Sequence, residues 1–126
     1  MRIIRRVPSG PWISITFPAS PDYLRLARLA TADVGSRAGL DYEEIDDLRI
    51  AVSELCSMIS GADDAVLTLE FSLEGADVEV VGDARPGALI DSDLSRAIVT
   101  AVVDEYAVEM GDGAAQFRAR KHARRR

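Results

Sequence analysis

The segment "DYEEIDDLRIAVSELCSMIS" (41–60) carries the pattern of a long amphipathic helix with a defined start. Asp41 and Glu44 have the spacing of a capping box, in which each side chain accepts a hydrogen bond from the other's backbone N–H. The apolar residues then follow the three- and four-residue spacing of a buried helix face, at Ile45, Leu48, Val52, Leu55, Cys56 and Ile59. Such a wide apolar stripe predicts a helix that packs against a second layer of structure.

The segments around this helix alternate between strand and helix patterns. Period-two alternation indicates strands and capped 3.6-residue periodicity indicates helices. In chain order the sequence predicts a strand at 12–18, a helix at 20–39 that Gly39 ends, the helix at 41–60, a hairpin at 65–84, a helix at 94–110 and a strand at 115–119. Because strands outnumber crossover helices, we expect an α+β fold: a two-layer α/β sandwich with a mostly antiparallel sheet and helices on one face.

The charges are distributed unevenly along the 126 residues. All 21 acidic residues but only six of the 15 basic ones lie between positions 7 and 117, which gives that stretch a net charge of −15. We therefore expect a basic N-terminal arm (1–10), one domain (11–120) and a basic C-terminal tail (121–126). An acidic body repels nucleic acid and attracts basic protein surfaces, so no nucleic-acid partner is expected.

Other features narrow the class of protein. No apolar run approaches the roughly 20 residues that span a bilayer, so no membrane partner is expected. The single cysteine, Cys56, excludes an internal disulfide framework and is typical of a reducing cytoplasm. It falls on the apolar stripe of its helix, which favours packing over thiol chemistry.

Glu54 stands beside the apolar stripe rather than opposite it, and Met58 follows one turn later on the same side. The surrounding "DDLRIAVSELC" resembles the N-box helix of the GHKL (histidine kinase-like ATPase) superfamily, whose fold is called the Bergerat fold. More narrowly, it resembles the bacterial serine-kinase anti-sigma factors, over about residues 12–117. The resemblance implies an E-x-x-x-N motif in which Glu54 is the catalytic base. The asparagine position, a magnesium ligand, is Met58, whose soft thioether cannot replace a carbonyl oxygen on that ion.

The family's D-x-G-x-G motif corresponds here to "DARPG". Asp83 and Gly87 match as nucleotide-binding residues, while Arg85 replaces the first glycine and either fills space that adenine needs or contacts phosphate. The lid that follows, "ALIDSDLSR", lacks glycine, and Asp91 and Asp93 place negative charge where phosphates would lie. We therefore expect no cofactor, with ATP and magnesium bound only if the site is functional. Met58 then packs into the space that a nucleotide would need.

Three functions follow from the resemblance. The first is an anti-sigma-factor regulatory protein of the cytoplasm, a pseudokinase that binds a sigma factor, a STAS-domain anti-anti-sigma partner, or both, in partner switching. The second is an active serine protein kinase that phosphorylates the STAS partner. The third is a non-catalytic dimeric adaptor, for which the exposed edge of the first strand near Trp12 is a candidate homodimer surface.

Overall fold

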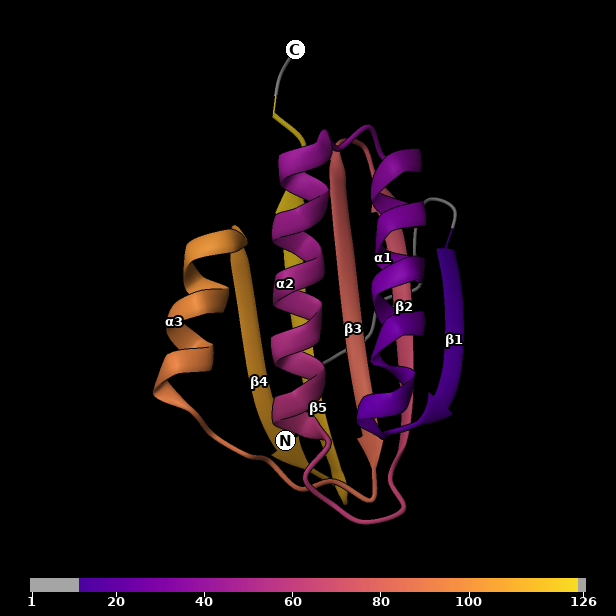
Figure 1. The fold of residues 1–126 in the computed structure, drawn as a ribbon, viewed down its shortest axis with the longest axis vertical. Coiled ribbons are helices and arrows are strands. Elements are labelled where there is room, and N and C mark those ends of the chain that lie inside the picture. The colour runs from indigo at the N-terminus through magenta and orange to yellow at the C-terminus, as the bar shows by residue number, and fades with distance from the viewer. Residues whose placement is uncertain (1–11, 125–126) are drawn as a thin grey trace.

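A computed structural model describes residues 12–124, and the predicted N-terminal arm (1–10) lies outside this range. Figure 1 shows the helices in front of a twisted sheet. The elements in chain order are β1 (Trp12–Pro18), the short 3-10 helix η1 (Pro21–Tyr23), α1 (Leu24–Arg37), α2 (Tyr42–Ile59), β2 (Val66–Glu74), β3 (Asp77–Arg85), α3 (Asp93–Val102), β4 (Glu105–Gly111) and β5 (Ala114–His122).

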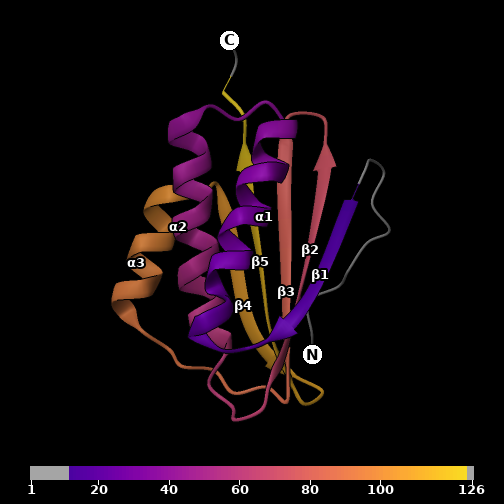
Figure 2. The same ribbon diagram turned by 45° about the vertical axis from the view of Figure 1, so that its right-hand side comes forward.

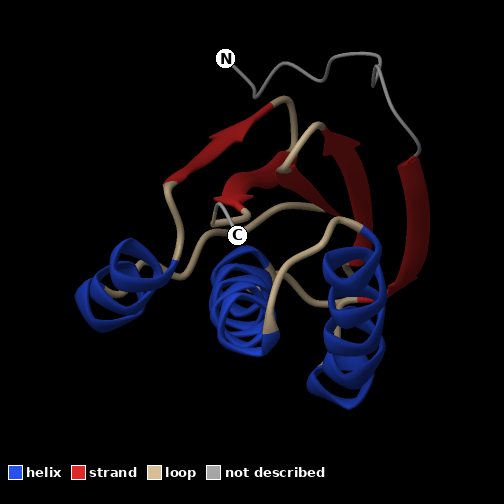
Figure 3. Cartoon of the chain, turned by 90° about the horizontal axis from the view of Figure 1, so that it is seen from above, coloured by secondary structure: helices blue, strands red, loops and turns tan. Residues whose placement is uncertain are grey.

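The sheet has the strand order β1-β2-β3-β5-β4, and every neighbouring pair is antiparallel. All three α-helices lie on one face of it, as the view from above in Figure 3 makes plain. The predicted two-layer sandwich with an antiparallel sheet is therefore confirmed. The turned view in Figure 2 separates the layers and shows β5 running between β3 and β4.

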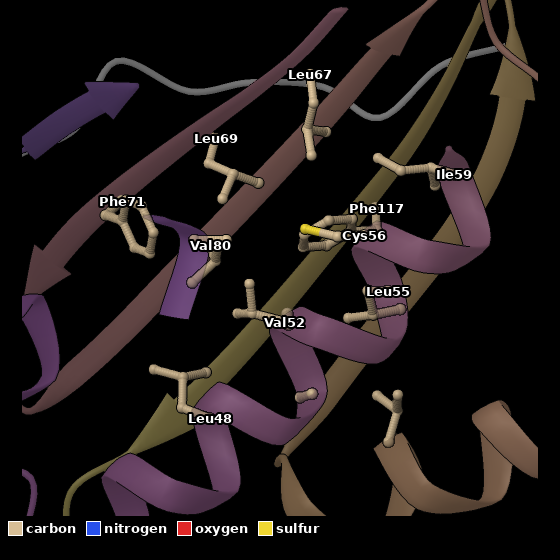
Figure 4. Close-up of a cluster of buried hydrophobic side chains, with 14 of the residues drawn as sticks. Leu48, Val52, Leu55, Cys56, Ile59, Leu67, Leu69, Phe71, Val80 and Phe117 are labelled. Carbon is tan, nitrogen blue, oxygen red and sulfur yellow. The ribbon is translucent and has the colours of Figure 1, made fainter. Parts of the chain in front are cut away.

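Helix α2 lies over the middle of the sheet and builds most of the core. Its capping box forms as predicted, because Asp41 Oδ1 accepts from the Glu44 N–H and Glu44 Oε1 accepts from the Asp41 N–H, both at 2.8 Å. The apolar stripe faces the strands, as Figure 4 shows for Val52, Leu55 and Cys56, which lie on the side of α2 toward the strands that carry Val80 and Phe117. Burial of these side chains is the main free-energy gain of the fold.

Helix α1 packs beside α2, and its buried residues are mainly small: Ala27, Thr31, Val34 and Gly35. Gly35 approaches Ile45 so closely that an added Cβ would lie 3.1 Å from the Ile45 side chain. Gly39 ends the helical segment with φ of +86°, as predicted for a glycine cap. Leu26 and Leu29, which the sequence places beside the apolar stripe, are exposed.

The prediction of one helix over 94–110 is wrong in its second half. Helix α3 ends at Val102, and residues 105–111 form β4. Tyr106 and Val108 pack against the core, and both are residue types that fit a pleated strand better than a helix. Pairing with β5 satisfies the backbone of this segment, which overrides the helical periodicity before it.

The last strand is longer than the alternation at 115–119 suggests. Lys121 and His122 belong to β5, and the Ala123 N–H donates to Ala76 O at 2.8 Å. The Arg124 N–H donates to Glu44 Oε2 at 2.7 Å. The strand thus continues past residue 120, where the sequence places the start of a tail, and the residues up to Arg124 are tied to the domain.

Candidate functional site

Glu54 lies on the side of α2 that faces α3. Its Oε1 accepts a hydrogen bond of 2.8 Å from the hydroxyl of Ser95, which is on α3. A general base needs a hydroxyl within this same distance. The structure therefore brings Glu54 together with a serine of its own chain, a contact that nothing in the sequence indicates because 41 residues separate the two.

Glu54 also borders an open hollow on the outer side of the helices. The hollow has a volume of about 410 Å³ and is lined by Arg28, Asp46, Arg49, Ile50, Ser53 and Glu54. Arg28 donates to the Ser53 hydroxyl at 3.2 Å, and Arg49 pairs with Asp46. Both arginines along this hollow are thus already engaged within the chain.

Met58 is buried, with 2% of its surface exposed. It lies one turn beyond Glu54 on the side of α2 that also carries the buried Ala51. Its backbone carbonyl accepts from the Ile90 N–H at 2.7 Å, so the segment after β3 is docked on the end of α2. Met58, the residue that the resemblance aligns with the asparagine of the motif, is therefore part of the core.

Asp83 and Arg85 lie on the opposite face of the sheet from Glu54. In β3 the side chains alternate, and Val80 and Ala84 are in the core beneath α2, so Asp83 points away from the helices. There Asp83 Oδ2 accepts from Gln116 Nε2 at 2.6 Å and Oδ1 accepts from Arg85 Nε at 3.0 Å. The structure does not bring Asp83 or Arg85 together with Glu54.

Gly87 has a structural reason to be glycine. An added Cβ would lie 2.2 Å from the Ala115 backbone nitrogen, and the Gly87 N–H donates to Gly113 O at 2.8 Å. The backbone at this position is thus pressed against the β4–β5 hairpin. A close approach of a nucleotide is not needed to explain the residue.

The next segment crosses the C-terminal end of α2. Ala88 forms a bridge with Ser60 and accepts from the Gly61 N–H at 3.1 Å. An added Cβ on Gly61 would lie 2.8 Å from Ala88 O, so the two backbones are in direct contact.

Asp91 and Asp93, the two acidic residues of the lid-like segment, are both exposed. Asp91 accepts from Arg96 Nε at 2.6 Å, and this hydrogen bond lowers the pKa of the Asp91 carboxyl below its ordinary value. Asp91 is therefore ionised at neutral pH. Ser92 between them caps α3, because its hydroxyl accepts from the Ser95 N–H at 3.2 Å.

These residues do not fit a magnesium–nucleotide complex. Met58 offers a buried sulfur where the ion prefers oxygen, and Asp83 is on the wrong face of the sheet to reach a nucleotide held beside Glu54. Among residues 12–124 no group of three or more His, Cys, Asp and Glu side chains is arranged to hold a metal ion. The arrangement offers a carboxylate and apolar packing, but not a phosphate cradle.

One partly buried ion pair beside this region was not anticipated from the sequence. Lys121 of β5 donates through Nζ to Asp47 of α2 at 3.2 Å and to the Val102 carbonyl at 2.8 Å. Lys121 therefore joins α2, α3 and the sheet at one point. A long basic side chain at the end of an alternating strand is the only local hint, and it reads equally well as a solvated surface residue.

The helices of the described part of the chain are too short or too polar to cross a membrane. This accords with the absence of a long apolar run in the sequence.

Comparison with known families supports the resemblance drawn from "DDLRIAVSELC". A family model described as a histidine kinase-like ATPase domain matches residues 17–105. The serine-protein kinase RsbW of Listeria monocytogenes is 40% identical over 73 residues, which are 54% of this chain and 46% of that protein. RsbW of Bacillus subtilis is 48% identical over 49 residues, 39% of this chain and 31% of that protein. The chain therefore spans less than half the length of these curated relatives.

A solved structure has the same fold. The crystal structure of the RsbU and RsbW domains of Rv1364c from Mycobacterium tuberculosis superposes with a TM-score of 0.70 at 21% identity, covering 90% of this chain and 32% of that one. At this level of identity the likeness concerns the architecture alone. It agrees with the sandwich derived from the strand and helix patterns.

Proposed function

This chain belongs to the family of histidine kinase-like ATPase domains, and from that premise we propose that it is an anti-sigma-factor regulatory protein with weak or lost kinase activity. It binds a sigma factor, a STAS-domain anti-anti-sigma partner, or both. The relatives that match it are named serine-protein kinases RsbW. The observation that carries the loss of catalysis is Met58, a buried thioether one turn beyond Glu54.

Binding without catalysis accounts for several features together. One oxygen of the Glu54 carboxylate, Oε1, already accepts a hydrogen bond from Ser95, a hydroxyl of the chain itself. Asp83 is held by Gln116 on the far face of the sheet. The net charge of −15 between residues 7 and 117 favours fast association with a basic partner surface and weaker association at high salt.

A nucleotide titration tests the loss of catalysis. We expect the melting temperature of the purified chain to stay unchanged when magnesium and ATP are added. A ligand present at 100 times its dissociation constant would add about 2.7 kcal/mol to the free energy of unfolding, which shifts the melting temperature by several degrees. Such a shift would contradict the proposal.

A second experiment tests the partner class. The chain is titrated in turn with the purified sigma factors and STAS proteins of its own organism, and binding is followed by calorimetry. We expect at least one of them to bind, with an affinity that falls as salt rises. Binding to neither class would remove the regulatory role and leave the dimeric adaptor, for which edge strand β1, with Trp12 53% exposed, is the candidate interface.

An active serine kinase is the second candidate, favoured by the presence of Glu54 at the position of the family's base. It requires labelled phosphate to pass from ATP to a serine of the STAS partner. That label must disappear in Glu54→Ala and persist in Glu43→Ala, an exposed glutamate of the same helix. Label that persists in Glu54→Ala would point to a contaminating kinase.

A further inference from the structure

Helix α3 has two apolar faces, and only one of them is used within the fold. The inner face carries Val99, which is fully buried, and Ser95, which donates to Glu54. The outer face carries a second apolar stripe at i, i+3, i+4 and i+7, the spacing by which one helix contacts another. Its members are Leu94, Ala97, Ile98 and Ala101.

The outer stripe is open to solvent along most of its length. Leu94 is 72% exposed, Ala97 and Ala101 are exposed, and Ile98 is half-buried. Figure 3 shows α3 at the end of the row of helices, with α2 on one side and no described helix on the other. Strand β4, next to α3, is the edge of the sheet, and no further strand follows it among the described residues. The stripe therefore lies on an open side of the described domain.

The charges around the stripe select its partner. Residues 91–104 contain three acidic residues and one basic residue, a net charge of −2. The single arginine, Arg96, is already paired with Asp91, while Asp93 and Asp104 are exposed at the two ends of the helix. A second copy would bring two such acidic surfaces together and be repelled. A helix with basic residues around an apolar stripe would complement both features.

We propose that the outer stripe of α3, Leu94 to Ala101, is a docking face for a basic amphipathic helix of another protein. Leu94 and Ile98 are the apolar anchors, and Ala97 and Ala101 permit close approach of the incoming helix. Asp93 and Asp104 meet its basic residues. This proposal names a surface and a partner chemistry, and it holds whether or not the partner is a sigma factor or a STAS protein.

The experiment uses the full chain and a synthetic peptide of about 20 residues, long enough to form a helix. The peptide carries leucine and alanine on one face and lysine and arginine on the other. We expect its addition to shift the amide NMR signals of residues 93–102 in a saturable manner. Leu94→Asn should weaken binding at least about tenfold, the effect of losing one buried leucine contact.

Three controls make the result decisive. Leu29→Asn changes a leucine of α1 that is also exposed and should leave the affinity unchanged. A scrambled peptide of the same charge should bind much more weakly, and salt near 1 M, where the Debye length is about 3 Å, should weaken the specific complex. Shifts centred elsewhere, or an affinity insensitive to Leu94→Asn, would overturn the proposal. So would sedimentation showing a dimer that Leu94→Asn dissociates, because the stripe would then bind a second copy.

Failure of this test is distinguishable from failure of the proposed function. The peptide experiment contains no sigma factor, STAS protein or nucleotide. A chain that binds its sigma factor through another surface would leave residues 93–102 unshifted by the peptide, which contradicts the docking face alone.

Discussion

The two ends of α2 are fixed by different kinds of interaction. At the N-terminal end Glu44, fully buried, accepts from the backbone of Asp41 and of Arg124, and one turn later Asp47 pairs with Lys121. At the C-terminal end Met58 is packed among apolar groups, and its carbonyl accepts from the Ile90 N–H. The N-terminal end of α2 is thus held by Lys121 and by the backbone of Arg124. The C-terminal end is held by the backbone of Ile90 and by apolar packing.

This difference matters because the residues that the resemblance assigns to catalysis and to the metal, Glu54 and Met58, lie toward the C-terminal end. A catalytic pocket there needs polar groups that are free to meet a ligand, as well as space. In this chain the space around Met58 is core and Glu54 is engaged by Ser95. The N-terminal end is as polar as an active site, yet every one of its named contacts is internal. A charged cluster alone is therefore a poor guide to function in this molecule.

The largest expected effect comes from Glu44→Ala, which breaks the N-terminal end. It leaves the N–H groups of Asp41 and Arg124 without their carboxylate acceptor in a buried position. We expect a loss of roughly 3 kcal/mol in the free energy of unfolding, measured by urea denaturation. Glu43→Ala, one residue away and exposed, is the control and should change stability little. Equal effects would mean that Glu44 does not hold this end.

The next effect comes from Met58→Asn, which restores the family's motif at the C-terminal end. An amide buried among apolar groups should cost about 2 kcal/mol of stability. Magnesium and ATP should still fail to raise the melting temperature, because Asp83 remains on the other face of the sheet. Recovery of nucleotide binding by this single change would show that the site is intact apart from Met58.

Cys56 of α2 is fully buried, so the pKa of its thiol measures how well the core beneath the helix excludes water. Burial raises the pKa of its thiol from 9.0 to about 12. The folded state thus keeps a proton that the unfolded state releases above pH 9.0, so stability falls as pH rises through the window from 9.0 to about 12. By pH 10 the loss should be roughly 1 kcal/mol, seen as a steeper decline for the natural chain than for Cys56→Ala. Parallel declines would show that the thiol is not buried.

The smallest effect is expected for Arg124→Ala. Its backbone N–H, rather than its exposed guanidinium, makes the 2.7 Å bond to Glu44. The variant keeps that bond and loses the exposed pair with Glu43 and a longer contact of 3.6 Å between Arg124 Nε and the buried Glu44 Oε2. Pairs made by so exposed a guanidinium are worth less than about 1 kcal/mol. Thermal melts should show a shift much smaller than that of Glu44→Ala, and a comparable shift would assign the role to the side chain.

The elements that could be predicted from the sequence are those whose signals are local. The capping box of α2, the glycine cap after α1 and the hairpin of β2 and β3 all depend on residues a few positions apart. The end of α3 was missed because its apolar periodicity runs into the alternation of β4. Only pairing with β5 decides between the two.

The candidate site depends on contacts between residues that are far apart in the chain, and such contacts give little signal in the sequence. Ser95 reaches Glu54 across 41 residues and Lys121 reaches Asp47 across 74. The face of Asp83 is an exception. The alternation that assigns Val78 and Val80 to the core already places Asp83 on the outer side. The strand pattern therefore predicts the face of Asp83 correctly, whereas the resemblance to the nucleotide-binding motif suggests a position in the site.

The position of β5 bears on how the protein is made. The ribosome releases β5 last among the described strands, yet β5 fills the middle of the sheet between β3 and β4 and supplies the buried Phe117. Until β5 emerges from the ribosome, the edge of β3 is unpaired and the apolar face of α2 lacks some of the strand side chains that cover it. Such a state is prone to aggregation. Folding of this domain is thus deferred until β5 has been synthesised, and nascent chains stalled before residue 114 should depend on chaperones.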